Sequence, residues 1–380
     1  MKQAWYLSLL IICFVCMPVH AEENKKEEVQ ELVKDTLFDT FDFREIDTVV
    51  RDIMPERKME FGETVRKILS GELELSADLL ISLLEDQLFY EFRTSKEGLI
   101  RILLIAVLAA VFTNFSGVLK HGQLEGIGFY VFYMLLITIA LNSFRIVLDS
   151  ATVGIERLII FMRALGPVYF LAVAIAAGNS TSIVFYNLVL FLIYIIELLV
   201  LNFLLPLLHV YMIVKMLNYI SAEDYLSKFA ELIEFLISWI SRALFTAVIG
   251  LNLIQGLITP VVDSLKRGML SKGMEALPAI GDAIGGVTEV ILGTAVLIKN
   301  GIGVAGAFIC ILLCMMPVLQ ILGVTFLYKL TAALIQPVSD RRIVGCISAV
   351  GEGGRLLLKL VFMTGVLFLL TISIVAATTT

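Results

Sequence analysis

The chain has 380 residues, of which 59% are hydrophobic and 17% charged, and its mean hydropathy is +0.93. Soluble globular proteins do not combine these values, so most of the chain must lie in lipid. The formal charge is −6. This acidic balance and the absence of a basic stripe argue against nucleic acid as a partner, because phosphate binding needs clustered lysine and arginine.

The N-terminus has the pattern of a secretory signal. Lys2 precedes an apolar run over residues 4–19, which is too short to span a bilayer. The small residues around Ala21 form a cleavage pattern just ahead of Glu22. These features predict a signal peptide over residues 1–21 with cleavage after Ala21. An uncleaved membrane anchor is the alternative.

Residues 22–98 hold most of the acidity, with 21 acidic and 11 basic side chains and therefore a net charge of −10. Ser76 can cap a helix whose apolar positions recur every three or four residues through Leu79 and Leu88. The pattern predicts a small extracytoplasmic segment of amphipathic helices. So much charge leaves a thin core, so we expect the segment to dock on the membrane domain or on a partner.

Residues 99–380 read as a polytopic helical membrane domain. Six apolar runs are long enough to cross the bilayer: 99–119, 127–147, 183–205, 239–260, 301–327 and 356–377. Two further segments, 164–178 and 276–298, are short or interrupted by helix breakers. The sequence therefore predicts an all-α fold with about eight spans, and six as the minimum.

The breakers in the two interrupted segments are Gly166 and Pro167 in the first, and Pro278 and Gly285 in the second. If both segments cross, the positive-inside rule puts the loops around Lys266 and Lys329 in the cytoplasm and the acidic stretch around Glu234 outside. Eight spans therefore fit the distribution of charges better than six.

The two interrupted segments also open stretches of similar plan, 164–260 and 276–377. With three spans in each, the two stretches would have opposite orientation. Such an inverted repeat with paired broken helices is typical of transporters that bind substrate near the bilayer midplane. Similarity among apolar segments also arises by chance, so the repeat is a hypothesis.

The motif search indicates no catalytic chemistry. Residues 301–306, Gly-Ile-Gly-Val-Ala-Gly, match GxGxxG but open a membrane span, so they predict close helix packing rather than a dinucleotide site. No P-loop, no HExxH and no Ser/His/Asp arrangement occurs in the sequence. We expect no cofactor, no metal site and no enzymatic activity.

The informative polar residues are those at membrane depth, where a charge is costly unless it is paired or faces water. Glu197 lies in the middle of a long apolar run. Asp282 and Glu289 are seven residues apart and would share one helix face, with Lys299 further along. These four residues are candidates for an ion or substrate path, or for structural pairing between helices.

Four stretches resemble a known family: Lys67-Ile68-Leu69-Ser70-Gly71-Glu72, the helix from Ser76 to Phe92, the span that opens Arg101-Ile102-Leu103-Leu104, and the glycine-rich run from Lys266 to Gly306. In this order they resemble the stage III sporulation protein AE family of endospore-forming bacteria. The likeness covers essentially the whole chain. It rests on patterns of elements and not on a catalytic signature.

The resemblance implies a subunit of the secretion-like channel that joins the mother cell to the engulfed forespore, in the mother-cell-derived outer forespore membrane. It implies a role in late forespore gene activation. It also implies partners: an ATPase, stage III sporulation protein AA, and a ring-forming protein, AH, which meets stage II sporulation protein Q across the intermembrane space. The number of copies stays open, a homo-oligomer included.

Two other functions are compatible with the sequence. The first is a self-sufficient secondary transporter, in which Glu197, Asp282 and Glu289 bind a coupling ion. The second is a scaffold that recruits ring components through its acidic segment and conducts nothing. Dependence on partner proteins separates the transporter from a channel core.

Overall fold

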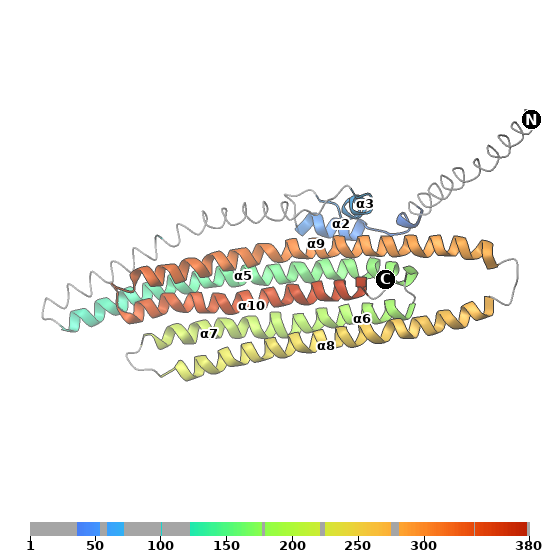
Figure 1. The fold of residues 1–380 in the computed structure, drawn as a ribbon. Coiled ribbons are helices and arrows are strands. Elements are labelled where there is room, and N and C mark those ends of the chain that lie inside the picture. Colours follow the sequence, from blue (N-terminus) through green and yellow to red (C-terminus); the bar gives the residue numbers. More distant parts are fainter. Residues whose placement is uncertain are drawn as a thin grey trace, which may run out of the picture.

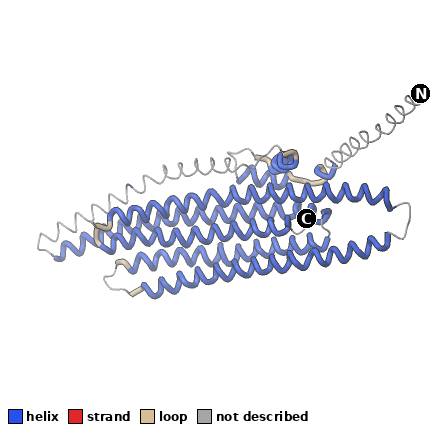
Figure 2. The backbone as a smooth tube through the Cα atoms, in the orientation of Figure 1, coloured by secondary structure: helices blue, strands red, loops and turns tan. Residues whose placement is uncertain are grey.

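The computed structural model describes residues 36–53, 59–71, 100, 122–176, 179–220, 225–274, 281–337 and 339–377. Across these ranges the regular structure is helical and no strand occurs (Figures 1 and 2). The predicted all-α class is thereby confirmed. The predicted signal peptide, the helix from Ser76 to Phe92 and the span over 99–119 lie outside the described residues.

Long antiparallel helices form the body of the protein (Figure 1). They are α5 (Gly122–Ala176), α6 (Asn179–Ile195), the π-helix η2 (Ile196–Leu204), α7 (Leu205–Asn218), α8 (Ser227–Met274), α9 (Gly281–Ile335) and α10 (Arg341–Ala377). α6, η2 and α7 continue one another, so the described part of the chain passes along the bundle five times. The 55 residues of α5 extend about 80 Å at 1.5 Å per residue, far more than one bilayer requires.

Two short amphipathic helices, α2 (Arg44–Ile53) and α3 (Phe61–Leu69), lie on one side of the bundle (Figure 1). In α2 the buried Ile46, Val50 and Ile53 recur at helical spacing, and the charged residues face outward. α2 packs against α5 and α3 packs against α9. The docking predicted for the N-terminal segment is thus seen in its described part.

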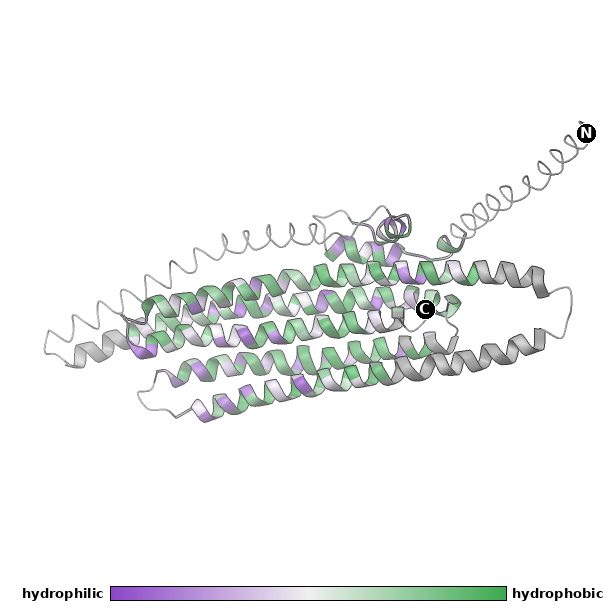
Figure 3. Ribbon diagram, viewed as in Figure 1, coloured by the Kyte–Doolittle hydropathy of each residue, from purple (hydrophilic) through white to green (hydrophobic). Residues whose placement is uncertain are grey.

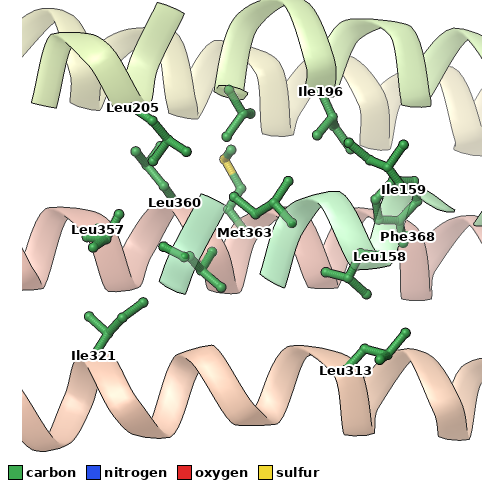
Figure 4. Close-up of a cluster of buried hydrophobic side chains, with 14 of the residues drawn as sticks. Leu158, Ile159, Ile196, Leu205, Leu313, Ile321, Leu357, Leu360, Met363 and Phe368 are labelled. Carbon is green, nitrogen blue, oxygen red and sulfur yellow. The ribbon is translucent and has the colours of Figure 1, made fainter. Parts of the chain in front are cut away.

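A continuous apolar core joins the long helices. Figure 4 shows side chains from α5, η2, α7, α9 and α10 meeting between the ribbons. Leu158, Ile196 and Leu360 in this core are each at most 1% exposed. Pairs of adjacent helices bury these side chains along most of their length, which makes the bundle one packed unit.

The helix break predicted at Gly166 and Pro167 is wrong, because α5 continues through both residues to Ala176. Gly166 is buried, and a Cβ there would lie 3.5 Å from the ring of Tyr186 on α6. Pro167 costs α5 one backbone hydrogen bond, but packing on neighbouring helices keeps the helix continuous. Residues 127–147 and 164–176 therefore belong to one helix.

The second interrupted segment is also continuous with the apolar run that follows it. Gly285 lies inside α9, which runs unbroken from Gly281 to Ile335, so no break occurs at Gly285. Pro278 lies outside the described residues. The stretch 276–377 thus contains two described helices rather than the three that an inverted three-span repeat requires. The structure does not show the predicted repeat.

The number of spans is smaller than expected. Within the described residues, five helices are long and apolar enough to cross a membrane: Tyr133–Ala176, Ser182–Asn218, Ser227–Leu251, Ile291–Ile335 and Arg341–Ser373. The prediction of about eight counted two helices twice, because hydropathy dips within a long helix look like loops between shorter ones. The sixth apolar run, 99–119, is outside the described part.

The expected topology of the loops is wrong as well. Lys266 lies near the end of α8 and Lys329 near the end of α9, and these helices are antiparallel neighbours in the chain, so the two lysines lie at opposite ends of the bundle. Glu234 and Arg355, expected on opposite sides of the membrane, form an ion pair at 3.5 Å. Both lysine loops were expected in the cytoplasm because α5 and α9, each one continuous helix, were each counted as two spans.

Candidate functional site

One half of the bundle is nearly free of charge. We call this half the belt; it comprises residues 158–176 of α5, 179–199 of α6 and η2, 243–262 of α8, 290–316 of α9 and 360–377 of α10. The charged residues within these ranges are Arg163, Glu197 and Lys299. The ranges contain 18 to 27 residues and extend about 27–40 Å, enough to cross the hydrocarbon thickness of a bilayer.

Contacts between helices show that the ranges of the belt lie at one level. A Cβ at Gly306 of α9 would lie 2.9 Å from Leu165 of α5, and one at Gly303 would lie 2.7 Å from the Tyr169 hydroxyl. Lys299 of α9 contacts Ala376 near the end of α10. A Cβ at Gly166 of α5 would lie 3.5 Å from Tyr186 of α6. The ranges on α5, α6, α9 and α10 therefore lie at one level.

Outside the belt, the helices carry most of their charges toward the end where α7 meets α8; we call this part the charged half. Figure 3 shows hydrophilic residues there and on α2 and α3. The charged residues of this half that the structure describes are Arg145, Asp149, Glu156, Arg157, Lys215, Lys228, Glu231, Glu234, Arg242, Lys329, Asp340, Arg341, Arg342, Glu352, Arg355 and Lys359.

Glu197, the carboxylate predicted at membrane depth, lies in η2 and is paired with Arg163 of α5. The π-helix ends at Leu204. The backbone N–H of Leu205, the residue that caps it, donates to the carbonyl of Val200, and Pro206 follows. This wider turn accommodates the proline, which cannot donate a hydrogen bond of its own. Glu197 and Arg163 neutralise each other within the belt, which accounts for both charges.

Lys299 is fully buried, and its Nζ donates a hydrogen bond of 3.1 Å to the carbonyl of Ala376. Ala376 is the penultimate residue of α10, where backbone carbonyls lack partners within the helix and the macrodipole is negative. Lys299 therefore caps α10. Lys299 was predicted to lie with Asp282 and Glu289 in a group of polar residues, whereas its hydrogen bond goes to a backbone carbonyl of α10.

Asp282 and Glu289 both lie on the α9 backbone, toward its beginning. Their side chains are outside the described part. Ten residues, or about 15 Å of helix, separate Glu289 from Lys299. The four predicted polar residues are thus not gathered into one site by the described structure: Glu197 pairs with Arg163, and Lys299 caps another helix.

A network of charges that the sequence did not predict joins α7, α8 and α10 in the charged half. Lys215 Nζ lies 3.1 Å from Glu352 Oε2, and Arg355 lies 3.5 Å from Glu234 Oε1. The Tyr211 hydroxyl donates 3.2 Å to Glu234 Oε2. No spacing rule could have linked these residues, because they come from three helices. The signal in the sequence that could have indicated this network was the presence of opposite charges inside otherwise apolar runs.

Glycines let α10 approach its neighbours at this network. A Cβ at Gly353 would lie 2.9 Å from Phe144 Cε2 and 3.0 Å from Met212 Cγ, and one at Gly351 would lie 2.7 Å from Lys329 Cγ. The Gly351–Gly354 turn therefore packs tightly while Glu352 reaches α7. The network and the glycine turn together fix the register of three helices.

The Lys215–Glu352 pair should respond to charge exchange. We expect Glu352→Lys to lower the thermal midpoint of unfolding in detergent, because two ammonium groups would then face each other. Adding Lys215→Glu restores the attraction and should recover most of that loss, with a coupling energy of about 1 kcal/mol for a partly exposed pair. Equal midpoints for the single and double variants would contradict the pairing.

The GxGxxG motif behaves as the sequence predicted. A Cβ at Gly301 would lie 2.9 Å from Leu69 Cδ2 of α3, and Gly303 and Gly306 lie close against Tyr169 and Leu165 of α5. The glycines thus allow α9 to pack closely against both neighbours. Within the described residues there is also no group of three or more metal-ligating side chains.

Comparisons with known proteins point to one family. The family model for stage III sporulation protein AE matches residues 59–379. The chain is 22% identical over 314 residues to the stage III sporulation protein AE of Bacillus subtilis (strain 168), covering 82% of this chain and 78% of that protein. No solved structure matches the chain. The match spans most of the sequence and confirms the resemblance, so this chain belongs to the stage III sporulation protein AE family.

Proposed function

We propose that this protein is the membrane-embedded core component of a secretion-like channel between the mother cell and the forespore, needed for late forespore gene activation. Membership of the family implies a role in sporulation. The observation that carries the proposal is the belt: five described helices each carry at least about 27 Å of apolar length, and the charges within it are paired or cap a helix. Such a body is built to stay in a bilayer.

The bilayer would cover the belt and leave the charged half in water. Apolar side chains on the outside of the belt support this placement, among them Leu190 and Phe191 on α6 and Leu251 and Leu253 on α8, each at least 40% exposed. The charged half offers ion pairs and exposed aromatic residues such as Phe235 and Trp239 to other subunits. The membrane would be the outer forespore membrane, with residues 22–98 outside the cytoplasm.

The partners proposed are the ATPase and the ring-forming protein of the same complex, and through the latter stage II sporulation protein Q. The sequence has no P-loop, so energy from nucleotide hydrolysis would have to come from another subunit. A self-sufficient secondary transporter is less well supported, because Glu197 is held by Arg163 and is not a free carboxylate. No described contact favours a purely structural scaffold.

The test is affinity purification of the tagged protein from sporulating cells in mild detergent, with partners identified by mass spectrometry. Recovery of an ATPase and ring-forming envelope proteins in fixed proportion is the expected result. Recovery of the protein alone, as a stable monomer or homo-oligomer, would contradict the channel-core proposal and favour a transporter.

A further inference from the structure

The helices α2 and α3 lie at the depth of the belt. The rings of Phe61 on α3 and Phe161 on α5 are 6.3 Å apart, and Leu69 of α3 lies against Gly301 of α9. Phe161 and Gly301 both belong to the belt, so the contacts of the helical pair fall inside it. Figure 1 shows the pair beside the middle of α9, away from either end of that helix.

The outer faces of α2 and α3 are strongly polar. Exposed ion pairs join Arg44 to Asp42 at 2.6 Å, Arg51 to Glu60 at 3.4 Å and Lys67 to Glu63 at 2.6 Å. These side chains are between 45% and 89% exposed. Hydrogen bonds from the Arg44 side chain and backbone also hold the pKa of Asp42 at about 2, so this carboxylate stays ionised at any physiological pH.

Exposed ion pairs of this density cannot face hydrocarbon. Each charge in lipid costs several kcal/mol, and these pairs are single surface bridges with no burial to strengthen them. The opposite side of the belt is apolar, because α6 and α8 expose large apolar side chains there, such as Leu190 and Leu251. At one depth, the bundle therefore has an apolar face and a polar face.

We propose that the outer face of α2 and α3 borders water at membrane depth and so forms part of the wall of an aqueous path, while α6 and α8 face lipid. The inference rests on the proposed placement of the belt in the bilayer. It assigns a surface to the proposed channel: the exposed side chains of α2 and α3, such as Thr48, Arg51 and Lys67, would contact the solvent in the path. α5 and α9 would hold that surface in place.

The first test asks whether α3 is docked on α9 in the membrane. In the full-length protein with Cys13, Cys16, Cys310, Cys314 and Cys346 replaced by alanine, cysteines at Leu69 and Gly301 should form a disulfide on mild oxidation. A Cβ at Gly301 would lie 3.1 Å from Leu69 Cγ. The Cβ of residue 69 is one C–C bond from that Cγ, so the two Cβ atoms are at most about 4.6 Å apart, near the upper end of the range for a disulfide. The matched control pairs Leu69→Cys with Gly293→Cys, because a Cβ at Gly293 meets nothing within 4 Å. Absence of the Leu69–Gly301 disulfide in intact membranes would overturn the inference.

The second test measures access of water and lipid with α3 held by that disulfide. A third cysteine at the exposed Thr48 should react with a charged, membrane-impermeant maleimide at least tenfold faster than one at the buried Val50 of the same helix. A bimane label at Thr48 should resist quenching by nitroxide-labelled phospholipid in proteoliposomes. An unreactive, lipid-quenched Thr48 position would overturn the inference.

Labels at Leu190 and Leu251 separate this failure from failure of the proposed function. Both should be quenched by the nitroxide-labelled phospholipid, since both are exposed apolar positions of the belt. If neither is quenched, the belt is not in the bilayer, and the proposed membrane placement fails together with the inference. If both are quenched and Thr48 is quenched as well, the belt stands and the aqueous face alone is wrong.

Discussion

Replacing Arg163 by leucine should strongly reduce the amount of folded protein in the membrane, whereas replacing Arg163 and Glu197 together by leucine should restore it. Arg163→Leu leaves the Glu197 carboxylate unpaired in the belt. An unpaired charge near the centre of a membrane helix costs about 2.5–3.5 kcal/mol or more. The double variant removes both charges, and apolar replacement of such a pair is often neutral or stabilising. Folded protein can be measured by fluorescence-detected size exclusion.

The same pair decides between a structural and a transport role for Glu197. Glu197→Gln keeps an oxygen that can accept from Arg163 but leaves the guanidinium without its counter-ion. We therefore expect a partial loss of folded protein, smaller than that of Arg163→Leu, with sporulation falling in proportion to it. If Glu197→Gln abolishes sporulation while the level of folded protein and its assembly stay normal, the carboxylate itself is functional. That result would favour a transporter over a channel core. A double leucine variant that fails to recover would show that the pair is not the cause of the loss.

Gly154→Ala should destabilise the bundle although it adds a single methyl group. A Cβ at Gly154 of α5 would lie 2.7 Å from Pro317 Cγ and 3.0 Å from Pro317 Cβ of α9. The proline ring is rigid and cannot rotate away, so α5 and α9 must move apart. Overpacking of this kind costs about 1–3 kcal/mol. The measurement is the thermal midpoint of unfolding in detergent.

Two variants control this prediction. Gly250→Ala on α8 makes the same chemical change where no atom lies within 4 Å, and the greater helix propensity of alanine should leave stability unchanged or raise it. Pro317→Ala removes the ring atom nearest to Gly154 and should rescue part of the loss in the double variant. If Gly154→Ala lowers the thermal midpoint equally in the wild-type protein and in the Pro317→Ala variant, the predicted clash with Pro317 is wrong.

The candidate polar residues show which inferences from sequence could succeed. Glu197 was recognisable because a lone carboxylate inside an apolar run needs an explanation wherever it lies. Its partner Arg163 was not, because Arg163 falls between the predicted span 127–147 and the predicted segment 164–178, just ahead of the predicted helix break. The pairing spans 34 positions and depends on α5 running straight through Gly166 and Pro167. A local breaker signal was overridden by packing between helices.

The network that links Glu352, Lys215, Glu234 and Arg355 was not predictable from the sequence, for a different reason. Lys215, Glu234 and Arg355 each look like a charge near the end of a span, where a long side chain reaches water by itself. Their contacts exist because α7, α8 and α10 extend beyond the belt and meet in the charged half. The lengths of these helices are seen only in the structure. Hydropathy alone divides a long helix at each polar residue and so underestimates its length.

The sequence by itself determined the class of the protein: apolar composition, helical spacing and the family patterns are properties that add up residue by residue along the chain, so they were readable without a structure. The tertiary structure alone decided the number of described membrane helices, the level of the belt and the partner of each buried charge. Those features depend on the register between helices that are distant in sequence. Register is set by side-chain packing and glycine contacts across the bundle, and these contacts cannot be read from any single segment of the sequence.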